Sequence, residues 1–155
     1  VDGEGNSKSY KVTAGVDLTD SIKLDVSSQT KSVDTNTDNG SRIEAGVTYT
    51  QPIVAGLSGY GRVGLGQKYT SSANNTYYSV EPGVKYAVNN DLSVKVGYRF
   101  RDATDNGANP DQLTRAWRYG AEYSLTKNYF VGVGYDRVRG DSKYDTYSAT
   151  VGFKF

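Results

Sequence analysis

The feature that most constrains this chain is a strict alternation of apolar and polar residues that ends in an aromatic residue. From Thr146 onward, one parity is polar and the other consists of Tyr147, Ala149, Val151, Phe153 and Phe155. Successive side chains of a β-strand point to opposite faces, so this segment has one apolar face and one polar face. The same rhythm recurs back to Tyr10, which is typical of a transmembrane β-barrel.

The composition is too polar for an ordinary soluble core. The 155 residues suffice for one domain, yet only 36% of them are apolar and the mean hydropathy is -0.62. In a barrel wall only alternate residues need to be apolar, because these face lipid while the others line a polar lumen. The 14 tyrosines suit a membrane interface, where the ring is in the apolar zone and the hydroxyl is in water. No apolar run approaches the roughly 20 residues that a membrane helix requires.

The period-two pattern predicts nine strands in a single domain over residues 1–155, with an all-β, antiparallel transmembrane barrel fold. The predicted strands cover 10–18, 22–26, 43–49, 57–69, 78–86, 92–100, 117–125, 129–135 and 147–155. Short connections (19–20, 89–91, 126–128) alternate with longer polar ones (34–41, 71–76, 102–112, 140–144). Barrels of this type place short turns in the periplasm and long loops outside the cell. We call the two ends of the strands the turn end and the loop end.

The outward aromatic residues fall into two levels. Those toward the loop end are Tyr10, Tyr69, Tyr78, Tyr98, Phe100, Trp117, Tyr135 and Tyr147. Those toward the turn end are Tyr49, Tyr86, Tyr123, Tyr129, Phe153 and Phe155. The last strand spans about 20 Å of height at a tilt near 40°, which fits the apolar band of an outer membrane. A soluble antiparallel barrel or sandwich is the alternative, and it would point the apolar parity inward.

The odd number of predicted strands leads to an expectation about the complete barrel. An odd number puts Val1 at the loop end, whereas single-chain bacterial barrels have an even number with both ends in the periplasm. We therefore expect at least one N-terminal strand to lie outside this chain. Ten strands is the minimal completion and twelve is the larger one. Two alternatives remain, a barrel of nine strands and an additional strand within the first eight residues.

Charged side chains occupy the inward parity, with twelve basic residues against six acidic ones. The candidate solute-binding residues of this lumen are Arg42, Arg62, Lys85, Lys95, Arg99, Arg101, Arg118, Glu44, Glu81 and Glu122. Fixed Lys and Arg in a narrow lumen concentrate anions and form anion selectivity filters. The alternative is a plug of ion pairs, because an unpaired charge in a tight lumen is costly. Strand number bears on the choice, since wider barrels leave room for water.

Three further arginines, Arg115, Arg137 and Arg139, fall on the outward parity just above the loop-end aromatic level. Lipopolysaccharide phosphates would lie at this level, and Arg suits bidentate phosphate contact. We predict contacts between these residues and lipopolysaccharide. The alternative is a solvated strand extension with no specific partner.

Nothing in the chain indicates catalysis. Without His and Cys it lacks the bases and nucleophiles that hydrolases most often use. Glu81 and Glu122 are surrounded by basic residues and are more simply interpreted as ion-pair partners than as a glycosidase pair. The stretch 34–40 resembles a calcium loop, but Ala45 stands where a bidentate Glu is required. We expect no enzyme activity, no cofactor, no metal site and no nucleic-acid partner.

The ending 151–155 is similar to the C-terminal signal that Gram-negative outer-membrane barrels present to the barrel assembly machinery, with Phe153 and Phe155 as its aromatic residues. The segments 79–83, 90–94 and 98–101 resemble the monomeric porins that carry acidic oligosaccharides such as oligogalacturonate or sialic acid. That resemblance implies a twelve-strand barrel in which rows of Arg and Lys guide the anionic sugar. By position these would be Arg62, Lys85, Lys95, Arg99, Arg101 and Arg118.

The sequence therefore predicts a bacterial outer-membrane barrel in contact with lipid and lipopolysaccharide. The predicted function is a passive, mildly anion-preferring, porin-like channel for small polar or acidic solutes. The alternative is a closed structural or interaction barrel with an ion-pair plug, serving as an adhesin, a phage receptor or a subunit of an outer-membrane complex.

Overall fold

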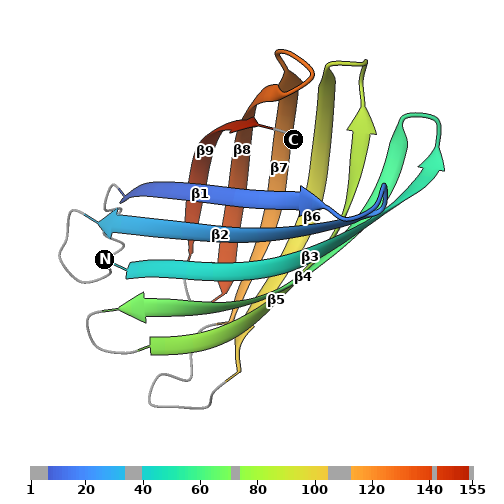
Figure 1. Cartoon of the computed structure of the whole chain (residues 1–155). Helices are drawn as coiled ribbons and strands as arrows, with labels where there is room; N and C mark the ends of the chain where they lie inside the picture. Colours follow the sequence, from blue (N-terminus) through green and yellow to red (C-terminus); the bar gives the residue numbers. More distant parts are fainter. Residues whose placement is uncertain (1–6, 34–39, 71–73, 105–112, 141–142, 154–155) are drawn as a thin grey trace.

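The computed structural model describes residues 7–33, 40–70, 74–104, 113–140 and 143–153. In these residues nine antiparallel strands form one sheet in chain order, so every strand pairs with its neighbours along the chain. The strands are β1 (Ser7–Asp17), β2 (Ile22–Val33), β3 (Gly40–Val54), β4 (Leu57–Thr70), β5 (Asn74–Ala87), β6 (Leu92–Ala103), β7 (Thr114–Ser124), β8 (Tyr129–Gly140) and β9 (Tyr144–Phe153). The sheet curls into an open half-barrel (Figure 1).

The predicted all-β fold and its nine strands are confirmed, and most strand ends shift by a few residues. The largest shift of a strand end is in β2, which continues past Val26 to Val33 through a polar segment. β3 also continues past its predicted end, from Tyr49 to Val54. The alternation weakens at the polar Gln51, and the register shifts between Pro52 and Val54. Proline has no N–H to donate to the ladder, so an irregularity at the end of a strand accommodates it. Gly56 has a φ of 78° and allows the tight turn into β4.

Three of the turn-end connections share one construction. Thr19, Asn89 and Thr126 each begin a turn, and their side-chain oxygens accept hydrogen bonds from backbone N–H groups two and three residues later. Ser, Thr and Asn side chains form such local turns readily. These bonds explain why short polar segments suffice to reverse the chain at this end.

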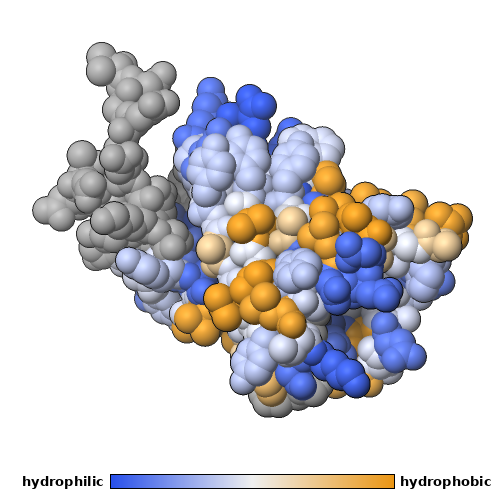
Figure 2. Space-filling model, turned by 90° about the horizontal axis from the view of Figure 1, so that it is seen from above, coloured by the Kyte–Doolittle hydropathy of each residue, from blue (hydrophilic) through white to orange (hydrophobic). Residues whose placement is uncertain are grey.

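The two faces of the sheet differ sharply in exposure. Apolar side chains of the predicted outward parity are open, such as Val133 at 65% and Leu65 at 63%. Charged side chains of the other parity are buried, such as Glu81 at 3% and Glu44 at 6%. In a single curved sheet the less exposed face is the concave one, so the charged parity lines the inside. Hydrophobic residues gather in patches on the surface seen in Figure 2.

Aromatic rings contact one another on the convex face. Four ring pairs lie toward the loop end: Tyr78–Phe100, Tyr98–Trp117, Tyr119–Tyr135 and Tyr135–Tyr147. One pair, Tyr129–Phe153, lies at the turn end with ring centroids 4.9 Å apart. Such pairs stabilise neighbouring strands by about 0.5–1.5 kcal/mol each beyond burial. The described part of the chain contains no helix that is long and apolar enough to cross a membrane.

The sheet has two open edges within the described residues, because β1 and β9 pair only with β2 and β8. An unpaired strand edge cannot face hydrocarbon, since each unsatisfied backbone group costs several kcal/mol there. A closed barrel wall in a membrane would therefore need both edges to be paired.

Candidate functional site

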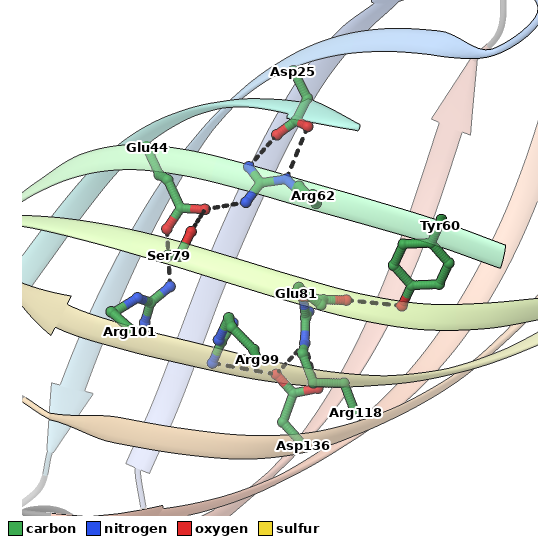
Figure 3. A network of polar contacts seen from close by, with 10 residues as sticks. All are labelled: Asp25, Glu44, Tyr60, Arg62, Ser79, Glu81, Arg99, Arg101, Arg118 and Asp136. Atoms are coloured by element: carbon green, nitrogen blue, oxygen red, sulfur yellow. Dashed lines mark hydrogen bonds and ion pairs between the residues drawn. The ribbon is translucent and has the colours of Figure 1, made fainter. Parts of the chain in front are cut away.

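The concave face carries a continuous set of ion pairs toward the middle of β2 to β6 (Figure 3). Arg62 on β4 reaches across β3 to Asp25 on β2, with Nη2 at 2.5 Å and Nε at 3.0 Å from the two carboxylate oxygens. Arg62 also donates to Glu44 on β3. Glu44 accepts further bonds from Arg101 at 2.9 Å and from Ser79 at 3.3 Å. One carboxylate is thus shared by two guanidinium groups.

A second group of ion pairs links β5, β6, β7 and β8. Arg118 donates to Glu81 at 2.6 Å through Nη1 and to Asp136 at 3.0 Å through Nε. The Tyr60 hydroxyl donates to the other oxygen of Glu81 at 2.9 Å. Arg99 contacts Asp136 only at 3.9 Å. Arg118 is therefore the main counter-charge of two carboxylates, while Arg99 has a weak partner.

Several concave cations have no carboxylate within ion-pair distance among the described residues. Lys85 and Lys95 are directly opposite each other in the β5–β6 ladder, and neither forms an ion pair with a described residue. Like charges in directly opposed positions destabilise a sheet. The Nε atoms of Arg99 and Arg101 are buried and have no hydrogen-bond partner among the described residues. Lys85 and Lys95 are exposed, so their ammonium groups can meet an anion in the lumen.

The excess of positive charge is a property of the whole concave face. Ten described cations and six described anions share its parity in the strand registers. Strand β6 contributes Lys95, Arg99 and Arg101 to this face and no carboxylate. Arg42 and Lys68 form another directly opposed basic pair, near the loop end of β3 and β4. A line of cations therefore follows the wall from one end to the other.

Glycines on the concave face let long side chains lie along the wall. A Cβ at Gly46 would overlap the Arg62 guanidinium, and a Cβ at Gly120 would lie 2.9 Å from Lys95 Cε. The Tyr60 ring lies over Gly83 and Gly97 in the same way. Side chains that lie flat over glycine occupy less of the lumen than side chains that stand upright.

Replacing Gly97 with alanine is expected to displace Tyr60 and weaken its bond to Glu81, because the new methyl group overlaps the Tyr60 hydroxyl. We expect the free energy of unfolding to fall by about 1–3 kcal/mol, the usual cost of overpacking. Gly61→Ala is the matched control, since a Cβ at Gly61 meets nothing within 4 Å. Chemical denaturation of both variants in lipid vesicles measures the difference. Equal stability of the two variants would show that Tyr60 does not depend on the space above Gly97.

The structure places every predicted lumen residue on the concave face by its register: Arg42, Arg62, Lys85, Lys95, Arg99, Arg101, Arg118, Glu44, Glu81 and Glu122. The ion-pair groups bring together Arg62, Glu44 and Arg101, and separately Arg118 and Glu81. The outward arginines Arg115, Arg137 and Arg139 share the face of Trp117. Phe153 lies on the convex face against Tyr129. Phe155 and the stretch 34–39 lie outside the described residues.

Sequence reasoning did not single out Tyr60, Ser79 or Tyr77 as members of the site. Tyr77 is 2% exposed, and the Arg101 guanidinium lies 4.6 Å from its ring centroid. The sequence analysis interpreted the tyrosines as membrane-interface residues and predicted no separate role for those of the concave parity. The glycines at the same level of the neighbouring strands, such as Gly66 beside Tyr77, were the available signal.

Comparison with known proteins agrees with this architecture. A family model described as an outer membrane protein beta-barrel domain matches residues 1–155. The chain is similar in structure to the KdgM porin in complex with disordered oligogalacturonate, with a TM-score of 0.63 and 18% identity over 95% of this chain and 76% of that chain. It is also similar to the NanC porin, with a TM-score of 0.51 and 14% identity over 97% of this chain and 80% of that chain. No curated protein matches the sequence.

Structural likeness at these identities concerns the fold, and it confirms the predicted resemblance to this class of porins. The family match over the whole chain indicates the bacterial outer membrane as its location. The convex apolar face, the concave charged face and the family model agree. This chain belongs to the outer membrane protein β-barrel family.

Proposed function

We propose that the protein forms a passive outer-membrane channel that prefers small anionic solutes. The observation that carries the proposal is the excess of cations on the concave face, ten against six among the described side chains. Low-dielectric walls focus the field of such charges and raise the local concentration of anions. In this proposal the long connections face the cell exterior and the short turns face the periplasm, as in other bacterial barrels.

The cations of β6 offer a path for the solute. Lys95, Arg99 and Arg101 share one face of the strand, and six residues of strand cover about 20 Å at roughly 3.3 Å each. Lys85 stands beside Lys95 at the turn end of this line. Along the strand the spacing of these cations is about 13 Å from Lys95 to Arg99 and about 7 Å from Arg99 to Arg101, so a solute meets a series of separate cations and no single tight site.

Acidic saccharides are the solute class that the site fits best. Their carboxylates can accept two parallel hydrogen bonds from one guanidinium group, and their hydroxyls can donate to the Tyr60 oxygen, whose own proton is given to Glu81. The similar KdgM structure is described as a complex with oligogalacturonate, an acidic saccharide. This likeness supports the proposal for the present chain.

The second candidate is a closed barrel whose role depends on its outer surface. The observation that favours it is the pairing of Arg62 with Asp25 and Glu44, and of Arg118 with Glu81 and Asp136. Such pairs neutralise charge that a conducting lumen would use. The glycines beneath Arg62, Tyr60 and Lys95 favour the open channel, because they keep these side chains close to the wall.

Conductance measurements separate the two candidates. We expect the full chain in a planar bilayer to conduct, with a reversal potential in a KCl gradient that corresponds to chloride preference. Lys85→Glu with Lys95→Glu should reduce that preference several-fold or invert it, because it replaces the opposed basic pair by an acidic one. Lys85→Arg with Lys95→Arg keeps the charge and should leave the reversal potential unchanged. Absence of conductance would favour the closed barrel, and cation preference of the unmodified protein would refute the anion channel.

A further inference from the structure

The loop end of the β7–β8 hairpin carries three arginines on its convex face. Arg115 and Arg139 are directly opposite each other in the ladder, and Arg137 is opposite Trp117. Directly opposed Cβ atoms lie about 4.5–5.5 Å apart, so the side chains can reach one common ligand. These three residues form a compact cationic patch on the outside of the wall.

The patch has too little counter-charge among the described residues. Arg139 bonds to Asp145 on β9 at 3.0 Å, and the Tyr135 hydroxyl donates to the other oxygen of Asp145 at 2.9 Å. Asp145 is directly opposite Arg137 in the β8–β9 ladder, yet its ion pair is with Arg139, and neither Arg115 nor Arg137 forms an ion pair with a described carboxylate. Asp102 on β6 has the same outward parity, yet no ion pair joins it to Arg115. Opposed like charges cost stability, so an external anion would relieve them.

The surroundings of the patch indicate where that anion comes from. One step toward the turn end, Trp117 packs edge-on against Tyr98 with ring centroids 5.1 Å apart, and Trp117 is 49% exposed. Below this pair the convex face is apolar and open, with Val133 on β8 and Val94 on β6 exposed. Aromatic rings of this kind mark the level of lipid headgroups. The arginines therefore stand just outside the hydrocarbon, at the height of the headgroup phosphates.

We infer that Arg115, Arg137 and Arg139 form a binding site for the phosphate groups of a lipid in the surrounding leaflet, which at the loop end is the lipid A portion of lipopolysaccharide. Guanidinium groups bind phosphate through paired charge-assisted hydrogen bonds. Asp145 and Tyr135 act as positioning residues, because they fix Arg139 beside Arg115. The site lies on the outside of the wall and does not depend on conduction through the lumen.

The chain contains one tryptophan, Trp117, which lies next to the patch and directly opposite Arg137. We expect its fluorescence to change when the full chain in phosphatidylcholine vesicles is titrated with bisphosphorylated lipid A. Arg115→Gln with Arg137→Gln should weaken this binding at least tenfold, because two charge-assisted contacts are lost. Lys127→Gln is the control. It removes a cation from the turn at the opposite end of the same hairpin and should leave binding unchanged. Circular dichroism and heat-dependent gel mobility check that each variant is folded.

Two further arms identify the ligand. Dephosphorylated lipid A should bind at least tenfold more weakly than the phosphorylated form, and inorganic phosphate at millimolar concentration should not displace the lipid. Equal binding of the dephosphorylated lipid would overturn the phosphate site, and displacement by inorganic phosphate would overturn the assignment to a lipid. Unchanged lipid A binding by the folded double variant would show that these arginines are a solvated strand extension.

Discussion

Replacing Arg118 with alanine is expected to lower the free energy of unfolding by about 3 kcal/mol, because Glu81 and Asp136 would lose their main counter-charge. Breaking a buried ion pair typically costs about 3–5 kcal/mol. We expect a cost at the lower end of this range, because the side chains of Arg118 and Asp136 are 22% and 21% exposed and are therefore only partly buried. The measurement is reversible denaturation in lipid vesicles. Lys127→Ala, an exposed turn residue, is the control and should change stability by no more than about 0.5 kcal/mol.

A double-mutant cycle tests the reason for this loss. The Glu81 side chain is 4% exposed, so its unpaired charge accounts for much of the cost in the Arg118→Ala variant. Adding Glu81→Gln removes that charge, keeps an acceptor for Tyr60 and should recover about 1–2 kcal/mol. If the second substitution recovered nothing, the ion pair would not be what Arg118 contributes. Simple packing by its side chain would then explain the loss.

The sequence was most informative where the physical constraint is local. A strand exposes alternate residues to lipid, so the apolar parity of β6 and β8 could be followed residue by residue without knowing the partners of either strand. The two outward aromatic levels follow from the same constraint, and the contacts of Tyr98 with Trp117 and Tyr129 with Phe153 agree with them. The predicted end of β3 at Tyr49 was wrong, because Gln51 and Pro52 interrupt the alternation while the backbone ladder continues.

The ion pairs could not be derived in the same way. The pair between Arg62 and Asp25 joins residues that are two strands apart, and it depends on the absence of a side chain at Gly46 of the intervening strand. Parity assigns both residues to one face, yet it does not give the register that brings them together. The same holds for Tyr60, which reaches Glu81 above Gly83 and Gly97. Partner choice inside the barrel is therefore a property of register and glycine placement.

Replacing Val133 with arginine should destabilise the protein by about 2–4 kcal/mol, the cost of a basic residue on the lipid face near the bilayer midplane. Val133 is 65% exposed and lies between the two aromatic levels of β8, four residues from Tyr129 and two from Tyr135. Ser148→Arg is the matched control, because Ser148 lies on the concave face of β9, opposite Gly134. The same charge there should cost less than about 1 kcal/mol, since it points into a polar lumen.

The comparison of these two variants tests which face of the sheet meets the hydrocarbon. Denaturation in vesicles of defined thickness gives both free energies, and tryptophan fluorescence from Trp117 reports the transition without an added label. The ordering of the two variants is the decisive quantity, because any general effect of adding an arginine is common to both. A Ser148→Arg variant that loses more stability than Val133→Arg would place lipid on the charged face. In that case the concave cations could not line a channel, and the arginine patch near Trp117 could not meet lipid phosphates.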